Sequence, residues 1–154
     1  MRRRERAIQE RAAIEEILSR ATVCHLGMCD GQQPYVVPVC HVYRDGCLYF
    51  HSATAGRKVR ILEQNPAVCF QVDVDHELLP ADRPCRWAMR YRSVIGFGRA
   101  SFVSDPHEKI AALDALMERH GGHGGSAYAP DALEKVLIVR IDVEHMTGKQ
   151  AGYS

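Results

Sequence analysis

Short apolar segments separated by tight-turn dipeptides run through most of this chain. Asp30-Gly31 and Asp45-Gly46 are typical β-hairpin turns, and each stands between segments rich in β-branched and aromatic residues. Strands joined by such turns pair antiparallel. Six segments have strand character: 22–28, 35–43, the segment ending at residue 51, 67–74, 87–104 and 135–143. The pattern predicts a mainly β fold, a six-stranded antiparallel β-barrel with helices packed outside it.

The segments between these strands have their own signals. Residues 3–20 carry an apolar stripe among arginines and glutamates, which predicts a surface helix, and a second helix is expected after Gly56. Asp105 is a favourable N-cap before Pro106, and this helix should end at Gly121-Gly122. Gly96 and Gly98 indicate a bend or bulge in their strand. Loops are expected at 75–86 and 121–126, and a polar tail at 144–154.

The segment 35–43 is apolar on both faces and carries Pro38 in its middle. Proline has no N–H to donate to a β-ladder, so Pro38 belongs at a sheet edge, at a bulge, or where the sheet meets a ligand or partner chain. A barrel this small has little reason to bury both faces of one strand by itself. The pattern therefore predicts that a ligand or a second subunit covers one face, and it favours a homodimer.

Composition limits the classes of function. The 154 residues, 46% of them apolar and 25% charged, are expected to form one domain over 1–154, with an N-terminal helix at 1–20 and a C-terminal tail at 144–154. The net charge of +1 argues against nucleic-acid binding through bulk charge, although arginines cluster at positions 2, 3, 4 and 6. No apolar run reaches the roughly 20 residues that span a bilayer, and a cytoplasmic protein without membrane or nucleic-acid partners is expected.

Six cysteines lie mainly within strand-like segments and do not form a loop framework, so they are expected to be reduced. Cys24-His25 and Cys40-His41 each pair two metal-ligand residue types. Neighbours on a strand point to opposite faces, however, and no CxxC pair is present. No metal site is predicted.

Residues 48–62 form the most informative local pattern. An apolar strand runs into a small-residue turn and then into a basic helix start, for which Thr54 is the expected N-cap. The unpaired N–H groups at a helix start attract anions, and Ser52, Arg57 and Lys58 add a hydroxyl and two cations there. The pattern predicts a phosphate site. The alternative is that the basic side chains only solvate the outer face of the helix.

Six segments together resemble the flavin-binding split barrels related to pyridoxamine 5′-phosphate oxidase, in particular the nitroimidazole-resistance branch. They are GQQPYVVPVCHVY (31–43), LYFHSATAGRKVRIL (48–62), NPAVCFQV (65–72), YRSVIGFGRA (91–100), residues 105–117 and TGK (147–149). The resemblance implies a six-stranded split barrel, usually a homodimer, with two FMN molecules at the subunit interface.

The resemblance also implies the residues that bind the cofactor. Those beside the isoalloxazine ring would be Val37, Pro38 and Val39, followed by His51, Ser52 and Ala53; Arg57 and Lys58 would hold the phosphate, and Ser93 and Val94 would reach the flavin, often from the partner chain. His51 is the candidate catalytic residue, handling a proton or binding an acidic substrate. Alternatively, His51 contributes only its backbone.

The sequence departs from pyridoxamine phosphate oxidase at its end. That enzyme grips its substrate with a C-terminal tryptophan and arginine and histidine residues, whereas this sequence ends Gly-Tyr-Ser and its one tryptophan is Trp87. We therefore expect an FMN-dependent oxidoreductase that reduces a nitro compound, a quinone or a similar small acceptor with electrons from a nicotinamide nucleotide or another donor, and not a vitamin B6 oxidase. The alternatives are a non-catalytic flavin- or haem-binding carrier or sensor and, more remotely, a nucleic-acid-binding accessory.

Overall fold

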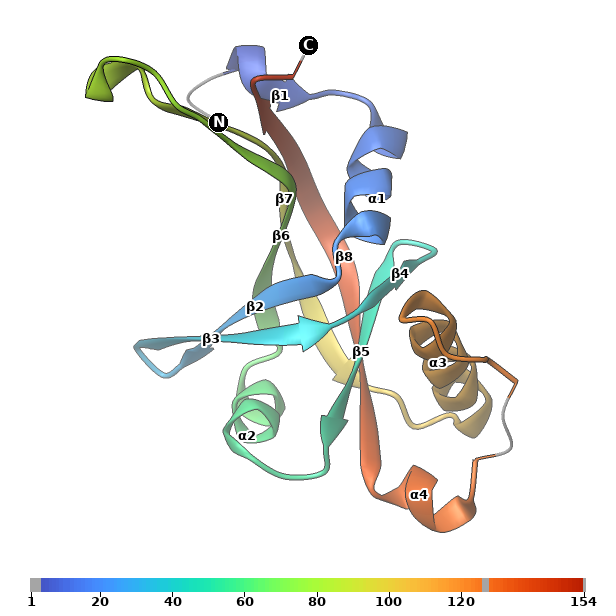
Figure 1. The fold of residues 1–154 in the computed structure, drawn as a ribbon. Coiled ribbons are helices and arrows are strands. Elements are labelled where there is room, and N and C mark those ends of the chain that lie inside the picture. The colour runs from blue at the N-terminus through green and yellow to red at the C-terminus, as the bar shows by residue number, and fades with distance from the viewer. Residues whose placement is uncertain (1–3, 126–127, 154) are drawn as a thin grey trace.

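A computed structural model describes residues 4–125 and 128–153. One antiparallel sheet dominates it, with strand order β3-β2-β6-β7-β8-β5-β4 and β1 paired to β8 (Figure 1). The strands are β1 (Ala7–Ile8), β2 (Val23–Asp30), β3 (Gln33–Cys40), β4 (Val42–Arg44), β5 (Cys47–Ala53), β6 (Ala67–Leu79), β7 (Ala88–Phe102) and β8 (Val136–Ala151). The predicted fold class is confirmed. Six strands were predicted and eight are described: the predicted strand 35–43 is divided at His41 into β3 and β4, and the two-residue strand β1 lies within the predicted first helix.

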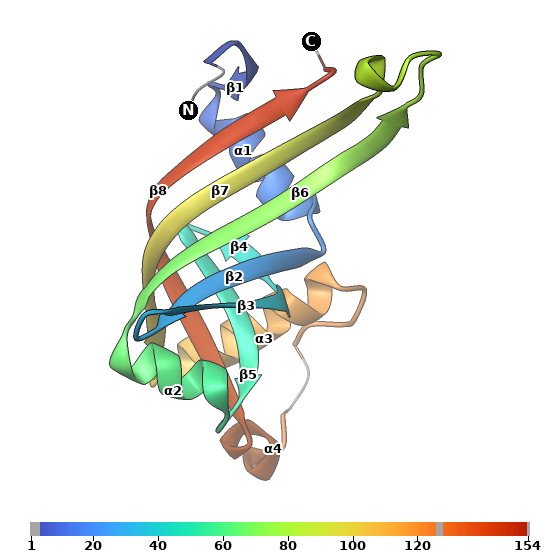
Figure 2. The same ribbon diagram turned by 90° about the vertical axis from the view of Figure 1, so that its left-hand side faces the viewer.

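The helices lie along one side of the sheet and at its lower end (Figures 1 and 2). They are α1 (Arg11–Arg20), α2 (Arg57–Gln64), α3 (Pro106–Arg119) and α4 (Pro130–Glu134), with 3-10 turns η1 (Arg4–Arg6) and η2 (Pro84–Arg86). None of the helices in the described residues is long and apolar enough to cross a bilayer.

Both predicted hairpin turns are present. Asp30 pairs with Gln33 across the β2–β3 turn, and Arg44 pairs with Cys47 across the β4–β5 turn. Asp45 and Gly46 both have positive φ, 50° and 82°, which is the backbone that a tight two-residue hairpin requires. The Asp-Gly signal therefore located these two connections correctly.

Two strands are longer than predicted. β6 continues through residues 75–79, which were expected to be loop, and β8 continues through residues 144–151, which were expected to be a polar tail. Backbone pairing with neighbouring strands supplies this structure: Glu77 pairs with Arg90, and Gly148 pairs with Val94. As a result the β6–β7 hairpin extends well beyond the body of the barrel (Figure 2). The predicted irregularity is present beside Gly98, but the extra residue belongs to the partner strand: Phe97 pairs with His145 and Gly98 with Val143, which leaves Glu144 of β8 as the bulge.

The first helix is shorter than predicted. α1 begins at Arg11, because residues 4–6 form a 3-10 turn and Ala7 and Ile8 pair with β8. Two predictions fall partly outside the described residues. The predicted helix begins at residue 3, and the predicted arginine cluster includes positions 2 and 3. Residues 126 and 127 also lie outside. The predicted α3 start is confirmed, since the Asp105 carboxylate accepts hydrogen bonds from the backbone N–H groups of His107 and Glu108. The five-residue helix α4 was not predicted.

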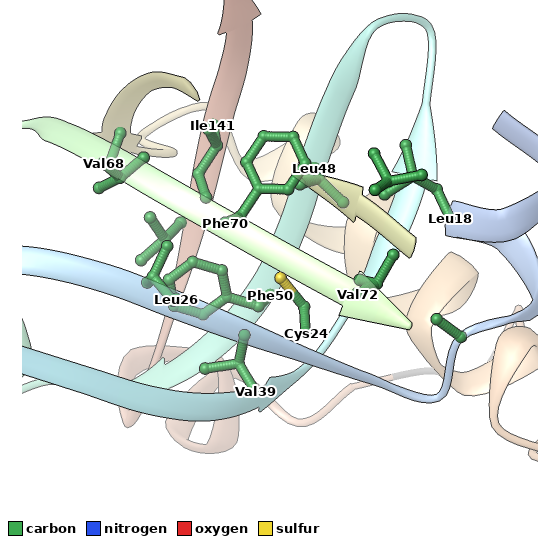
Figure 3. Packing of buried hydrophobic residues seen from close by; sticks show 14 of the residues in the cluster. Leu18, Cys24, Leu26, Val39, Leu48, Phe50, Val68, Phe70, Val72 and Ile141 are labelled. Carbon is green, nitrogen blue, oxygen red and sulfur yellow. The ribbon is translucent and has the colours of Figure 1, made fainter. Parts of the chain in front are cut away.

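The barrel interior is filled by apolar side chains that alternate along each strand (Figure 3). Phe50 and Phe70 are the largest fully buried side chains. Phe70 lies over Gly96 so closely that a Cβ there would stand 2.1 Å from Cζ of the ring, so this position requires glycine. A second, smaller core packs α3 against the outside of β4, β5 and β8: Val42, Ala112, Ala115, Leu116 and Ile138.

Candidate functional site

An opening in the barrel separates β3 from the end of β5. β3 is an edge strand that pairs only with β2, and beyond Tyr49 the strand β5 pairs only with β8. The two strands nevertheless approach within 8 Å between Cα atoms. Cys40, next to the predicted segment 37–39, and His51, the first residue of the predicted segment 51–53, line one hollow beside the opening. The opening leaves main-chain groups of both strands available for a ligand. Pro38 stands in the edge strand, as a proline requires.

Side chains at this opening alternate between the interior and the outside. Val39 and Ser52 are 8% and 7% exposed and point into the barrel, so they can offer a ligand chiefly their main chain. Pro38, His51 and Ala53 point outward and are exposed, while Val37 is half-buried against the core.

The turn after β5 leads to a helix start without a side-chain cap. The N-cap of α2 is Gly56, with φ of 134°, and the prediction that Thr54 caps this helix is wrong. The helix begins at Arg57, three residues beyond Thr54, so its first internal hydrogen bond runs from Arg60 N to Gly56 O over 3.1 Å. No side chain caps the preceding N–H groups, and the first turn holds no acidic residue. This mouth can receive an anion.

The two predicted phosphate ligands point in different directions from this mouth, because successive helical residues are rotated by about 100°. Arg57 donates to Asp30 at 3.1 Å and to Gln33 at 3.0 Å, and its guanidinium lies 4.5 Å from the centre of the Tyr35 ring. These contacts attach α2 to the β2–β3 hairpin.

Lys58 is the cation of the pair that has no counter-charge. Its Nζ lies 5.1 Å from the centre of the Phe50 ring, and it makes no ion pair within the described residues. Its side chain is half-buried, and burial lowers the pKa of the ammonium group below its ordinary value. An anion bound at the start of α2 would supply the missing counter-charge.

His51 opens onto an apolar hollow of about 290 Å³ on the outside of the barrel. The hollow is lined by Cys40, His51, Leu113, Leu116, Met117, His120 and Tyr128. Sequence reasoning did not connect the α3 residues or the two residues after it with the site. No local signal could have done so, because only the packing of α3 on β5 brings them together.

Ser93 and Val94 do not join this opening within one chain. They lie on β7, three strand positions away from β3 in the sheet order, which corresponds to about 14 Å. The Val94 side chain is fully buried in the barrel core, whereas Ser93 is half-buried on the outer face opposite Asp73 and Lys149. A contact between β7 and a ligand at the opening would have to come from a second subunit.

The Cys-His pairs point to opposite faces, as their strand positions imply. Cys24 is buried and His25 exposed, whereas Cys40 is exposed and His41 is buried with its Nε2 3.0 Å from the Leu18 carbonyl oxygen. Within residues 4–125 and 128–153, no group of three or more His, Cys, Asp or Glu residues is arranged to hold a metal ion.

Comparisons with known proteins place this geometry in a family. A crystal structure described as a candidate 5-nitroimidazole antibiotic resistance protein from Bacteroides thetaiotaomicron is 32% identical, covering 94% of this chain and 86% of the other, with a TM-score of 0.83. Two further structures show the fold alone. A FAD- and haem-binding protein from Mycobacterium smegmatis is 18% identical (96% and 74% covered, TM-score 0.86), and a FAD-binding protein from Mesorhizobium loti is 24% identical (96% and 98% covered, TM-score 0.71).

Among curated proteins, none matches the chain. The family model for pyridoxamine 5′-phosphate oxidase matches residues 10–150, a range that runs from the start of α1 almost to the end of β8 and contains the barrel opening, the α2 mouth and His51. The resemblance found in the sequence is therefore confirmed, and the chain belongs to the pyridoxamine 5′-phosphate oxidase family.

Proposed function

We propose that this protein is an FMN-dependent oxidoreductase that reduces a small acceptor such as a nitroimidazole or a quinone. The observation that carries the proposal is the uncapped start of α2, where half-buried Lys58 has no counter-charge beside the barrel opening. A helix start of this kind suits a phosphate. One such mouth fits the single phosphate of FMN, and the flavin-binding relatives named above support a flavin as the cofactor.

The residues at the opening fit a bound flavin. The mouth at Gly56 and Lys58 would hold the phosphate, and the main chains of Val39 and Ser52 would face the ring from the two unpaired strand edges. When bound, the flavin supplies hydride transfer. The protein's own part is to neutralise the phosphate, orient the ring and present His51 to the reactants.

His51 is the side chain at the opening that can move a proton. Its imidazole is exposed and lines the apolar hollow, so it can reach a ligand there. Reducing a quinone to a quinol takes two electrons and two protons. A nicotinamide nucleotide would supply the hydride and become oxidised, and the second proton comes from solvent through an acid such as His51.

The outer face of the sheet supports a homodimer. The strand register places Val36, Gly27, Cys69 and Phe97 in one row across β3, β2, β6 and β7, and Pro38, His25, Gln71 and Ile95 in the next. Val36 is 62% and Phe97 48% exposed, and none of the helices in the described part of the chain lies on this face (Figure 2). A second subunit would cover these side chains and could bring its β7, with Ser93, to the opening.

One spectroscopic experiment tests the cofactor and the donor together. The purified protein should show the twin near-ultraviolet and blue bands of a flavin, and anaerobic addition of reduced nicotinamide nucleotide should bleach the blue band. A Soret band instead would favour the haem carrier. A flavin that no donor and acceptor can cycle would favour the storage alternative.

The role of His51 is tested by His51→Ala. FMN should stay bound, because the phosphate contacts are untouched, while reoxidation of the reduced flavin by a nitroimidazole or quinone should slow by about 10² to 10⁴. Equal rates at saturating acceptor would reduce His51 to a backbone contact.

The dimer is tested by sedimentation equilibrium on the wild type and on Phe97→Glu. We expect a wild-type dimer and a weakened or monomeric variant, because the new carboxylate would be buried at the interface. Arg44→Glu, an exposed change on β4 at the other end of the strand order, serves as the control. A wild-type monomer that carries flavin at micromolar concentration would contradict the proposal. The six free cysteines are in keeping with the reducing cytoplasm, which we propose as its location.

A further inference from the structure

The hollow beside His51 has walls from two different parts of the chain. Cys40, at the end of β3, and His51, on the outward side of β5, form one wall. The second half of α3 forms the opposite wall with Leu113, Leu116 and Met117. His120 and Tyr128, which follow that helix, complete the lining. The hollow therefore adjoins the barrel opening but is separate from the anion mouth, which lies beyond Ala53 at the start of α2.

The size of the hollow limits what can occupy it. Its 290 Å³ correspond to about ten water molecules at liquid density, which is the scale of one or two fused rings. A dinucleotide is much larger than this space. No Asp, Glu, Lys or Arg belongs to the lining, so a strongly charged ligand would lose hydration there without gaining a partner.

The lining has few polar groups, and they differ in whether they already make a hydrogen bond. The Tyr128 hydroxyl already donates to the Asp114 carboxylate over 2.8 Å. The imidazoles of His51 and His120 make no hydrogen bond within the described residues, and both side chains are exposed. Between them lie aliphatic side chains and the Met117 thioether, which packs well against aromatic rings.

We propose that this hollow binds the ring system of the acceptor: a flat, uncharged molecule of one or two rings whose oxygen atoms accept hydrogen bonds from His51 and His120. That the bound ring is an electron acceptor depends on the oxidoreductase function proposed above. That such a ring binds at all depends only on the hollow. Leu113 and Met117 determine which rings fit, because they form the apolar wall. His120 positions the ring and does not transfer electrons.

Binding of 2,3-dimethyl-1,4-naphthoquinone to the protein as purified tests this assignment. Both ring positions that could add a thiol are blocked in this probe, so Cys40 cannot trap it covalently. Isothermal titration calorimetry on the oxidised protein measures affinity without turnover, and the methyl NMR signal of labelled Met117 reports where the probe sits. We expect saturable binding and a shift of that signal.

Met117→Trp should fill the hollow and weaken probe binding at least tenfold. Ala111→Trp is the matched control, since it adds a larger side chain to the same helix at a position exposed away from this lining. His120→Ala should weaken binding about threefold to tenfold, the effect of one hydrogen bond, without changing flavin content. Circular dichroism melting verifies that each variant is folded.

Several results would overturn the proposal. They are the absence of probe binding, equal affinity in the wild type and Met117→Trp, and competition between the probe and FMN, which would assign the hollow to the cofactor ring. A different result would contradict the proposed function while leaving this proposal intact. Protein that neither carries nor takes up flavin, yet binds the probe with the expected Met117 dependence, would refute the flavin and retain the ring-binding hollow.

Discussion

The helices α2 and α3 begin in opposite ways. At α3, the Asp105 carboxylate accepts hydrogen bonds from two backbone N–H groups, Pro106 occupies the first turn and Glu108 adds a negative charge there. At α2, the N-cap is Gly56, no side chain accepts from the first turn, and the first two residues are Arg57 and Lys58. The protein itself satisfies the start of α3, but it leaves the start of α2 to water or to a ligand.

The far end of α3 also lies against the body of the protein. The Arg119 guanidinium donates to the Ala21 carbonyl at 3.0 Å. His41, between β3 and β4, makes a hydrogen bond to the Leu18 carbonyl. These contacts hold the C-terminal end of α1 and its cap. The comparison teaches that a helix start capped by its own sequence serves stability, whereas an uncapped, basic start beside an opening is available for an anion.

The largest expected effect is the response of the α1–α3 region to acid. Burial, assisted by the nearby charges of Arg119 and His120, lowers the pKa of His41 to about 4. The unfolded chain takes up this proton near pH 6.5, so stability is complete above that pH and is lost as pH falls towards 4. A span of about 2.5 units corresponds to about 3 kcal/mol.

Urea unfolding at several pH values between 7 and 4 measures this loss. His41→Gln should unfold with a flatter pH dependence than the wild type across that window. His25→Gln, a change at an exposed histidine that is not among the groups shifting the pKa of His41, serves as the control and should keep the wild-type slope. Identical slopes in the wild type and His41→Gln would remove His41 from this role.

The next prediction separates the two helix starts by their contribution to FMN binding. Lys58→Ala should weaken FMN binding by about tenfold to a hundredfold, because one charge-assisted bond contributes about 1.5 to 3 kcal/mol. Removing Arg57 as well should bring the loss to at least about a hundredfold. Flavin fluorescence titration measures both. Lys109→Ala, in the first turn of α3, is the matched control and should bind FMN normally. Full affinity in the folded double variant would refute the anion site.

Asp105→Ala should show the reverse behaviour. Losing the α3 cap should lower the free energy of unfolding by about 1 kcal/mol, while FMN affinity stays within twofold of the wild type. Urea denaturation and the same fluorescence titration provide the two readings. A large loss of FMN affinity together with unchanged stability would overturn the division between the two starts.

Arg57→Ala alone should have the smallest effect. Its charge is shared with Asp30 at 3.1 Å on a partly exposed surface, so its removal should cost less than about 1 kcal/mol of stability. For the same reason it should weaken FMN binding less than Lys58→Ala does. The ratio of the two single-variant affinities decides this point, and a larger loss from Arg57→Ala would show that the arginine leaves Asp30 when the ligand binds.

Local signals in the sequence determined several parts of this protein correctly. The Asp-Gly pairs located two hairpins and Asp105 located the start of α3, because positive φ angles and helix capping depend on a few adjacent residues. The alternation of apolar residues in 67–74 placed Val68, Phe70 and Val72 on one side of their strand, and all three are buried in the barrel core. The six resembling segments identified the family, since such motifs are read directly from residue order.

Tertiary structure alone decided the rest, because it depends on which distant segments lie together. Residues 144–151 are polar, yet they form a strand because β7 and β1 offer them backbone partners. The adjacent cations Arg57 and Lys58 have different roles because Asp30 lies on only one side of the helix. The hollow beside His51 exists because α3 packs across β5, which brings residues more than 60 positions apart into the lining of one hollow.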